Sequence, residues 1–593
     1  ANEALRLSEE IVVTSSRLPL SQQRLGVSLS VLTEEAIDSY GNQAVADILR
    51  QTPAVTTSSS GGMGQPTSVR IRGEEVYRTL TLLDGIRIQD PSGVQIATPF
   101  EHLLSEGLGR IEILRGPQGL AYGADAGGVI SISSQRIEEG FRFGGDIQTG
   151  RYGSNQLGVM LGGGVDKLDY NLSATSYSND GFNARQSDNT LGDDDGYQNT
   201  TFHGRLGFDL SEQLRLEMVH HNVDAESEFD GCFTVSRVDN CLAKNQIAAT
   251  RLALEIGGES FNHSLSYNNT KTDRDSFASN TFSFGAEGEL ERWEYLGNAT
   301  GLPGFDVVFG ADHEEASNNG IERGNTGLFV EYLSDFSDSL FFTAGLRHDE
   351  NDDFGSNTSH RLSASYLRAL GQGTLKIRGA VGTGFRSPSP YEIAYNAGPF
   401  AFPPAAGTSL EQEDSRGWEA GVEYYLDRVH FEAVYFDQDV ENAIYFDLST
   451  FSGYLQDIGK GSSRGYELSG RIPLSDTWQL LANYTHNETE RPDGSPRLLR
   501  PEHLFNTGAI YTSDEGRMRF ALYYRSQTDA EDIGNTTVDG YGIVDINGSV
   551  QVSDSLRVYA RVENLLDENY TQVTDYNTAG RAAYIGLNYS FTR

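Results

Sequence analysis

The sequence lacks any long hydrophobic run, because no stretch of its 593 residues approaches the roughly 18 apolar residues of a transmembrane helix. Positive charge is also scarce, since 45 Lys and Arg face 84 Asp and Glu for a net charge of −39. This balance excludes a typical nucleic-acid partner and suits polar loops and cation sites. Such hydropathy is typical of a soluble multidomain protein, but also of a transmembrane β-barrel, whose apolar residues occupy every second position.

Cysteine is nearly absent, and Cys232 and Cys241 lie nine positions apart in a polar stretch. In an oxidising compartment this pair is expected to form a disulfide that closes a small loop, and the spacing does not favour a CxxC-type metal site. Ala1 is not followed by a basic and then apolar run, so we expect a mature chain whose secretion signal has been removed. The sequence also lacks a nucleophile–base–orienter set, a phosphate loop and HExxH, so no enzyme activity, catalytic residue or catalytic cofactor is predicted.

From about residue 138 to 591, apolar and polar residues alternate along the chain. Segments of about ten residues, such as 518–525, 556–563 and 583–591, place apolar side chains on one face and charged or small ones on the other. A soluble β-sandwich would show the same alternation, so the connections between the segments must distinguish a sandwich from a barrel. Short turn signals alternate with long stretches rich in Gly, Asn and Asp, as in an outer-membrane barrel. The short turns lie near Asp166, Glu212, Gly257, Pro303, Ser337, Gly371, Asp427, Asp476, Asp514 and Asp554.

Ten short turns predict 22 strands if both chain ends lie in the periplasm, and a barrel of this size needs a plug in its lumen. The preceding residues supply a domain of suitable size. Thr33 is a plausible N-cap for a short helix, residues 44–50 continue helically, and Pro53 ends that helix. Short strands follow to about Arg136.

Five segments in this first part, residues 9–15, 69–73, 82–86, 110–117 and 122–130, occur in the order and spacing of a known family. They resemble the TonB box and plug domain of TonB-dependent outer-membrane receptors. The resemblance implies an all-β membrane protein, a 22-stranded antiparallel transmembrane β-barrel with an N-terminal α+β plug domain inside the lumen. The expected divisions are 1–20 for the N-terminal segment, 21–136 for the plug and 137–593 for the barrel.

The resemblance also implies a location and an energy source. The chain is expected in the Gram-negative outer membrane, as a monomer in contact with lipid and lipopolysaccharide. TonB and its inner-membrane energising complex would drive active import of a small-molecule nutrient. Phe591 resembles the terminal aromatic of the family, although Thr592 and Arg593 follow it.

The TonB box should be extended, mobile and able to add as an edge strand to a partner sheet. Its β-branched residues suit this role, although an ordinary first strand of the plug would have the same composition. The predicted box consists of Glu9, Glu10, Ile11, Val12, Val13, Thr14 and Ser15.

Buried arginines of the plug require partners. We expect ion pairs with lumen-facing carboxylates of the barrel, which would hold the plug yet let it shift, or would be merely structural. The arginines are Arg70, Arg72, Arg110 and Arg115, and the candidate carboxylates are Glu419, Glu423 and Glu467.

Two plug loops are expected to face outward and bind substrate, through backbone donors and small side chains that allow close approach. Neither loop contains a basic cluster, which counts against a strongly anionic ferric siderophore. The expected substrate-binding residues are Ser60, Gly61, Gly62, Met63, Gly64, Gln65, Gln89, Asp90, Ser92 and Gln95.

Carboxylates crowd the region between residues 180 and 241, where they would repel one another unless solvated or bridged by a hard cation such as calcium. Within the family, the whole chain is most similar to the cobalamin receptor branch, with further echoes at residues 123–128, 384–388, 410–419, 497–501 and 563–581.

That resemblance implies structural calcium in the outer loops, held by Asp193, Asp195, Asp230 and Asp239. Asn183 stands where the branch has an aspartate, and the Cys232–Cys241 pair is an addition that could order the same loop without metal.

The leading hypothesis is therefore TonB-dependent import of cobalamin or a related corrinoid. Alternatives in the same class are a ferric siderophore, haem or another metal chelate. Alternatives from other classes are a passive porin or adhesin barrel and an outer-membrane enzyme.

Overall fold

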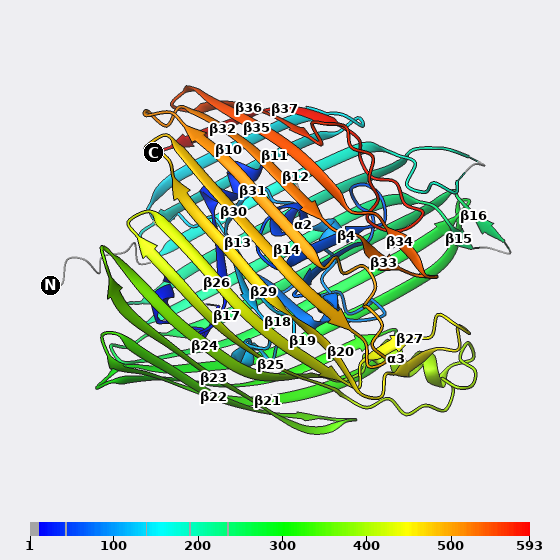
Figure 1. Ribbon diagram of the computed structural model, residues 1–593, viewed down its shortest axis with the longest axis horizontal. Helices are drawn as coiled ribbons and strands as arrows, with labels where there is room; N and C mark the ends of the chain where they lie inside the picture. The colour runs from blue at the N-terminus through cyan, green and yellow to red at the C-terminus, as the bar shows by residue number, and fades with distance from the viewer. Residues whose placement is uncertain (1–10, 13, 42–43, 138, 189–190, 234–235) are drawn as a thin grey trace.

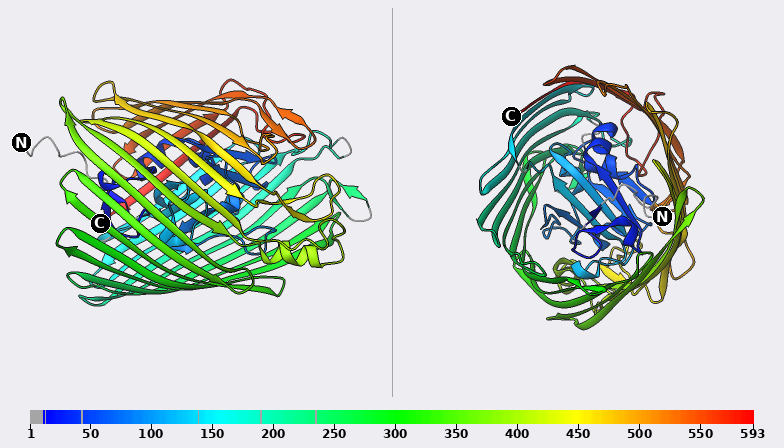
Figure 2. Two further views of the ribbon diagram at one scale, coloured as in Figure 1. Left: turned by 60° about the horizontal axis from the view of Figure 1, so that its bottom comes forward. Right: turned by 90° about the vertical axis from the view of Figure 1, so that its left-hand side faces the viewer.

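The computed structural model describes residues 11–12, 14–41, 44–137, 139–188, 191–233 and 236–593. A closed antiparallel barrel surrounds an N-terminal plug, as Figures 1 and 2 show. Twenty-two strands form the wall, so the predicted fold class and strand number are confirmed. β10 pairs with β37 and thereby closes the sheet.

The wall strands follow one another in chain order. They are β10 (Gly140–Gly150), β11 (Asn155–Val165), β12 (Leu168–Phe182), β13 (Asp195–Ser211), β14 (Leu214–Phe229), β17 (Cys241–Ile256), β18 (Phe261–Ala278), β19 (Thr281–Leu302), β20 (Phe305–Asn318), β21 (Ile321–Ser337), β22 (Leu340–Asn351), β23 (Gly355–Leu370), β24 (Gly373–Arg386), β25 (Glu413–Leu426), β26 (Val429–Glu441), β29 (Lys460–Pro473), β30 (Trp478–Glu490), β31 (His503–Thr512), β32 (Met518–Gln527), β35 (Tyr541–Ser553), β36 (Leu556–Glu563) and β37 (Ala582–Thr592).

The two ends of the barrel differ in their connections. One end has the ten short turns that the sequence predicts. The other carries longer loops, which contain the helix α3 (Pro390–Ala397) and three small hairpins. The hairpins are β15 (Cys232–Phe233) with β16 (Arg237–Val238), β27 (Ile444–Phe446) with β28 (Tyr454–Gln456), and β33 (Ala530–Asp532) with β34 (Thr536–Val538).

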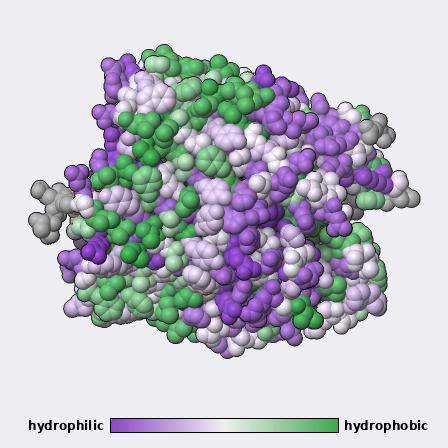
Figure 3. All heavy atoms as spheres, viewed as in Figure 1, coloured by the Kyte–Doolittle hydropathy of each residue, from purple (hydrophilic) through white to green (hydrophobic). Residues whose placement is uncertain are grey.

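The outer surface of the wall is apolar. On β32, Phe520, Leu522 and Tyr524 are exposed, while Ala521 and Tyr523 between them are buried toward the plug. Exposed hydrophobic side chains at every second position form the lipid-facing band of an outer-membrane barrel. In Figure 3 hydrophobic residues gather toward the short-turn end, and hydrophilic residues prevail toward the loop end. Among the described residues, the helices are too short and polar to cross a bilayer.

The plug is built on a five-stranded sheet in the order β3-β8-β9-β6-β7. Its strands are β3 (Leu29–Thr33), β6 (Thr79–Leu83), β7 (Ile86–Arg87), β8 (Leu108–Arg115) and β9 (Gly128–Ser134). The helices α1 (Glu34–Tyr40) and α2 (Val45–Leu49) and a hairpin of β4 (Val55–Ser59) with β5 (Thr67–Ile71) accompany it, as do four short 3₁₀ turns, η1 (Gln22–Arg24), η2 (Val76–Arg78), η3 (Phe100–His102) and η4 (Leu120–Tyr122).

Local sequence explains the first plug helix. The Thr33 side chain accepts a hydrogen bond from the Ala36 amide, and Gly41 ends α1 in the left-handed conformation. The helix packs into a core that continues into the barrel wall, where Ile48 of α2 and Tyr523 of β32 belong to one cluster of buried side chains. The plug is thus seated by continuous apolar packing as well as by polar contacts.

Candidate functional site

Within the N-terminal segment, the structure places residues 11–12 and 14–20 against the plug inside the barrel. Ile11 and Val12 form β1, which pairs with β2 (Leu20–Ser21), so this segment is continuous with the plug rather than separate from it. The amide and hydroxyl of Thr14 both donate to Glu112 Oε2, at 3.0 and 2.6 Å, and Arg361 of the wall donates to the Ser15 carbonyl at 2.7 Å. Of the predicted TonB box, Glu9, Glu10 and Val13 lie outside the described residues.

Arg72 joins the plug to two strands of the wall. Its guanidinium contacts Glu419 of β25 and Glu467 of β29, each at 2.7 Å, and all three side chains are almost completely buried. Arg115 reaches the same Glu467 at 3.1 Å. The Ser28 amide donates to Glu419 at 2.5 Å, so these carboxylates are neutralised and hydrogen-bonded at once.

The other two predicted arginines need correction. Arg70 donates to Ser58 of its own hairpin at 2.6 Å, and burial, aided by nearby Arg500, lowers its pKa to about 9. Arg110 pairs at 2.8 Å with Glu112 of its own strand. Strand geometry explains both, because cross-strand and same-face neighbours within the plug offer partners before the wall is reached. Glu423 similarly pairs within the wall, with Lys376 and Arg378.

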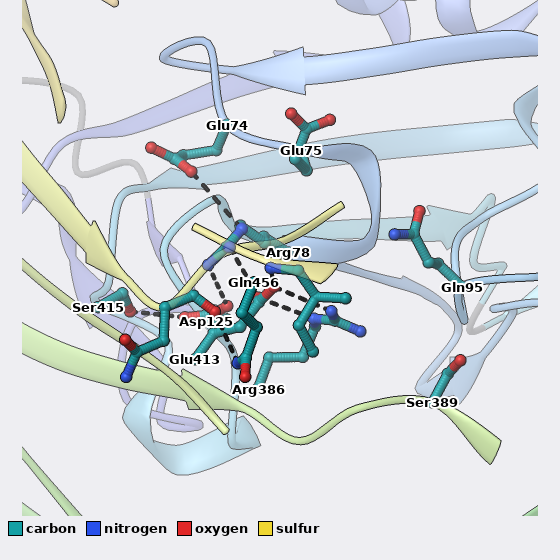
Figure 4. A network of polar contacts seen from close by, with 12 residues as sticks. Glu74, Glu75, Arg78, Gln95, Asp125, Arg386, Ser389, Glu413, Ser415 and Gln456 are labelled. Atoms are coloured by element: carbon teal, nitrogen blue, oxygen red, sulfur yellow. Dashed lines mark hydrogen bonds and ion pairs between the residues drawn. The ribbon is translucent and has the colours of Figure 1, made fainter. Parts of the chain in front are cut away.

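A second ionic network, which sequence reasoning missed, joins the plug to β24, β25 and α3, and Figure 4 shows its residues Arg78, Asp125, Arg386 and Glu413. Arg78 of the plug contacts Asp125 at 3.1 Å and Glu413 of β25 at 2.7 Å. Arg386 of β24 contacts the same Glu413 at 2.8 Å and Glu392 of α3 at 3.0 Å. Asp125, Arg386 and Glu413 belong to three separate segments that carried the family resemblance, and the structure brings them together. The sequence did contain a signal for this network, because Arg386 and Glu413 are charged residues at the facing ends of β24 and β25.

The first apical loop, residues 60–65, contacts the wall below the outer loops. Gln65 donates to the Glu228 carbonyl at 2.6 Å, and Ser227 donates to the Gly64 carbonyl at 2.9 Å. A Cβ on Gly64, whose φ is +80°, would overlap the ring of Tyr197, so this close approach requires glycine.

The second apical loop, residues 89–95, contacts a different part of the wall. Asn318 of β20 donates to the carbonyls of Pro91 and Gly93, at 2.9 and 3.2 Å. Within the loop, Ser92 donates to Asp90, and Gln95 donates to Glu392 of α3 at 3.2 Å. Gln89 is buried against the plug. The loop therefore connects the plug to the same α3 that closes the Arg386 network.

A cavity lies between the first apical loop and the wall. Its charged lining is balanced, and burial raises the pKa of Glu101 to about 7. The charged groups are Asp47, Glu101 and Glu563 against Arg50, Arg151 and Arg525, and the aromatic groups are Phe100, Tyr152, Tyr177, Phe182, Tyr570 and Tyr584.

Aspartates of the β12–β13 loop and the β14–β17 loop lie close together. Carboxylate oxygens of Asp188, Asp193 and Asp230 lie within 4.8 Å of one another. Oxygens bound to one calcium ion at 2.3–2.6 Å lie no more than about 5 Å apart, so the three are close enough to share an ion. Both Asp230 oxygens are buried without a hydrogen-bond partner in the described structure. Burial, followed by the charges of Asp188 and Asp239, raises the pKa of Asp230 to about 6.

The remaining residues of this region have different surroundings. Asp195 accepts a hydrogen bond from the Ala184 amide at 2.7 Å, and Asp239 lies 3.6 Å from Arg237. Asp188, which the sequence analysis did not select, is 3.4 Å from the Asn183 amide group. It thus supplies a carboxylate beside the position where Asn183 removes one. Cys232 and Cys241 are joined by a disulfide with an S–S distance of 2.07 Å.

Comparison with known proteins adds two family matches. Residues 136–565 match the TonB dependent receptor-like β-barrel family, and residues 21–130 match the TonB-dependent receptor plug domain. A vitamin B12 transporter, BtuB, from Photobacterium profundum is 25% identical over 98% of this chain and 96% of its own length. BtuB of Vibrio cholerae is 24% identical over 100% of this chain and 97% of its own.

Solved structures show the same fold. The ferric enterobactin receptor PfeA of Pseudomonas aeruginosa has a TM-score of 0.82 at 18% identity, over 98% of this chain and 100% of its own. The siderophore receptor PirA of Acinetobacter baumannii has a TM-score of 0.80 at 19% identity, over 96% and 99%.

Proposed function

This chain belongs to the TonB-dependent receptor family of the outer membrane, and we propose that it imports cobalamin or a related corrinoid. Relatives named as vitamin B12 transporters align with the plug and the barrel together, over nearly the whole of both chains. The likeness to siderophore receptors lies below 20% identity and supports the fold alone.

The observation that carries the proposal is the chemistry of the cavity beside residues 61–64. Its lining has equal numbers of carboxyl and guanidinium groups, three of each, and several aromatic rings. Anionic metal chelates require an excess of positive charge, since a buried anion needs compensating cations. A large, amide-rich ligand instead needs apolar surface, hydrogen-bond donors and close backbone approach. The aromatic rings of the lining provide the apolar surface, and its guanidinium groups provide hydrogen-bond donors.

Calcium is the second part of the proposal. Asp188, Asp193 and Asp230 would hold the ion, with Asp195 and Asp239 beside them. The two Asp230 oxygens that lack a hydrogen-bond partner in the described structure support this assignment. A buried carboxylate that accepts no hydrogen bond is costly unless a cation compensates its charge. The ion would join the β12–β13 loop to the β14–β17 loop and so order the rim above the cavity.

Energy coupling follows from the position of the N-terminal segment. Substrate contact with the apical loops would shift the plug and release Thr14 and Ser15 from Glu112 and Arg361. The freed residues 9–15 would then pair with TonB as an added edge strand, and the pull would open a passage.

Binding of cyanocobalamin to the detergent-purified protein tests the proposal, with calcium present and then after a chelator. Tight binding that weakens on chelation, and that Asp230→Asn reproduces while Asp493→Asn does not, would support both parts. Tight binding indifferent to chelator and to Asp230→Asn would keep the substrate and refute the calcium role. Failure to bind in either condition would refute the corrinoid assignment and direct the search to iron chelates.

A further inference from the structure

Two histidines face each other on the outside of the barrel, near the loop end of β30 and β31. His486 and His503 are direct cross-strand partners, and their rings lie 4.9 Å apart with a 24° interplanar angle. Thr485 and Asn487, the chain neighbours of His486, are buried toward the plug, so His486 points outward. The two strands lie side by side in Figure 1.

Glu502, the residue before β31, completes a triad. Its Oε1 lies 3.4 Å from His486 Nδ1 and 3.5 Å from His503 Nε2. Two ligands bound to one tetrahedral ion at about 2.0–2.1 Å are about 3.4 Å apart. His486 Nδ1 is moreover buried, and it has no hydrogen-bond partner among the described residues.

The other ring nitrogens are engaged by neighbours. His503 Nδ1 lies 2.7 Å from the Tyr484 hydroxyl, and His486 Nε2 lies 3.5 Å from a carboxylate oxygen of Glu488. Histidine ligands of metals generally hold their second nitrogen in such contacts, which fix the tautomer and the ring orientation. In both rings the nitrogen turned toward Glu502 is therefore available to a metal.

We propose that His486, Glu502 and His503 bind Zn²⁺ on the outer wall of the barrel, with water as the fourth ligand. Two imidazoles and one carboxylate suit a borderline-soft tetrahedral ion, whereas the oxygen-only Asp188, Asp193 and Asp230 cluster suits a hard cation. The site is independent of the corrinoid proposal, because neither its residues nor its ion contacts the cavity.

The position of the ion suggests its role. Glu502 ends the loop of residues 491–502, in which Arg497 and Arg500 pair with Glu74 and Glu75 of the plug at 3.2 and 2.6 Å. Zinc bound to Glu502 and to two wall strands would hold the end of this loop in place. It would thereby stabilise the ion pairs through which this loop contacts the plug.

Zinc binding to the purified full-length protein without a polyhistidine tag tests the site. Isothermal titration should detect one chelator-reversible Zn²⁺ that the His486→Asn/His503→Asn double variant loses. Glu502→Gln should weaken the affinity at least about tenfold. Co²⁺ in place of Zn²⁺ should give the intense visible absorption of a tetrahedral ion with the wild type and not with the His486→Asn/His503→Asn double variant.

Matched controls keep the test specific. His348→Asn removes an outward-facing histidine outside the triad, and Asp230→Asn alters the acidic cluster, so both should bind zinc as the wild type does. Heat-modifiable electrophoretic migration establishes whether each variant is folded. If the double variant is not folded, zinc binding by Glu502→Gln decides whether the triad is the site. Equal zinc binding by the wild type and the folded triad variants would overturn the proposal. A loss of zinc binding in His348→Asn as large as that in the triad variants would also overturn it.

Discussion

At the scale of single residues, Arg72 shows how a buried charge joins the two domains. One guanidinium neutralises carboxylates from two different wall strands, and each of those carboxylates has a further partner. Ion pairs of this kind add little net stability when intact, but losing one partner leaves an uncompensated buried charge.

Arg72→Ala is therefore expected to destabilise the seated plug by about 3–5 kcal/mol. The measurement is the urea concentration at which plug amides lose protection from hydrogen exchange, which should fall. Arg416→Ala is the matched control, because the Arg416–Asp439 pair is exposed and should contribute less than about 1 kcal/mol. An equal response of the two variants would contradict this account of the interface.

If calcium binds as proposed, Asp230 should make its affinity dependent on pH. Because its pKa is raised to about 6, it is ionised at pH 7.5 and mostly protonated at pH 5. Protons compete with the cation, so calcium affinity is expected to fall about tenfold between these pH values. Calcium titrations of the wild type and Asp230→Asn would measure this, and the variant should bind more weakly with a flatter profile. A wild-type affinity constant across this range would refute the role of Asp230.

At the scale of elements, β1 would have to change partners under the proposed coupling to TonB. It is paired with β2 inside the barrel, yet recognition by TonB requires an exposed edge. Proline lacks the N–H that an added strand needs. Val12→Pro should therefore reduce uptake to the level of unenergised cells and leave substrate affinity in detergent unchanged, whereas Val12→Thr should transport normally. Transport by the proline variant would exclude β-strand pairing at this position.

The Cys232–Cys241 disulfide restrains the loop that carries Asp230 and Asp239. A pre-ordered loop loses less conformational entropy when it binds an ion. Calcium affinity of a Cys232→Ser/Cys241→Ser variant is expected to fall about threefold to tenfold relative to the wild type. Titration in parallel with the wild type treated with a reductant would measure it, and unchanged affinity in both would mean that the disulfide does not order the site.

At the scale of the whole molecule, the barrel and the plug form one closed unit. The wall of 22 strands leaves a wide lumen, which the plug fills. Removal of residues 1–136 should convert a silent protein into an open pore, measured as conductance across a planar bilayer. Heat-modifiable migration would show that the truncated barrel is folded, and a folded but non-conducting barrel would mean that the outer loops alone close the lumen.

The strands and turns could be predicted because their signals are local. Alternation at residues 518–525 follows from one wet and one lipid-facing side, and the short turn at Asp427 follows from residues that tolerate positive φ. Ten short turns predicted 22 strands on the condition that both chain ends lie at the short-turn end, because each turn then joins two strands and the first and last strands add two. The division near residue 136 also lies between β9 and β10.

The candidate sites depended on contacts that no local pattern encodes. Arg70 lies on β5 and Arg72 directly follows the end of that strand, yet only Arg72 forms an ion pair with the wall. Asp188 replaces the charge missing at Asn183 only because the loop folds back on itself. The triad of His486, Glu502 and His503 exists because the register of β30 and β31 opposes the two rings.

The sequence by itself determined the barrel, its plug, its membrane location and its family, since hydrophobic periodicity and motif order act along the chain. Tertiary structure alone decided which polar and charged groups meet, as with the Ser415 hydroxyl and the Asp125 carboxylate, which lie far apart in sequence and 2.5 Å apart in space. The physical reason is that burial and ion pairing depend on how the plug is rotated within the wall. That rotation is set by packing over the whole interface rather than by any one segment.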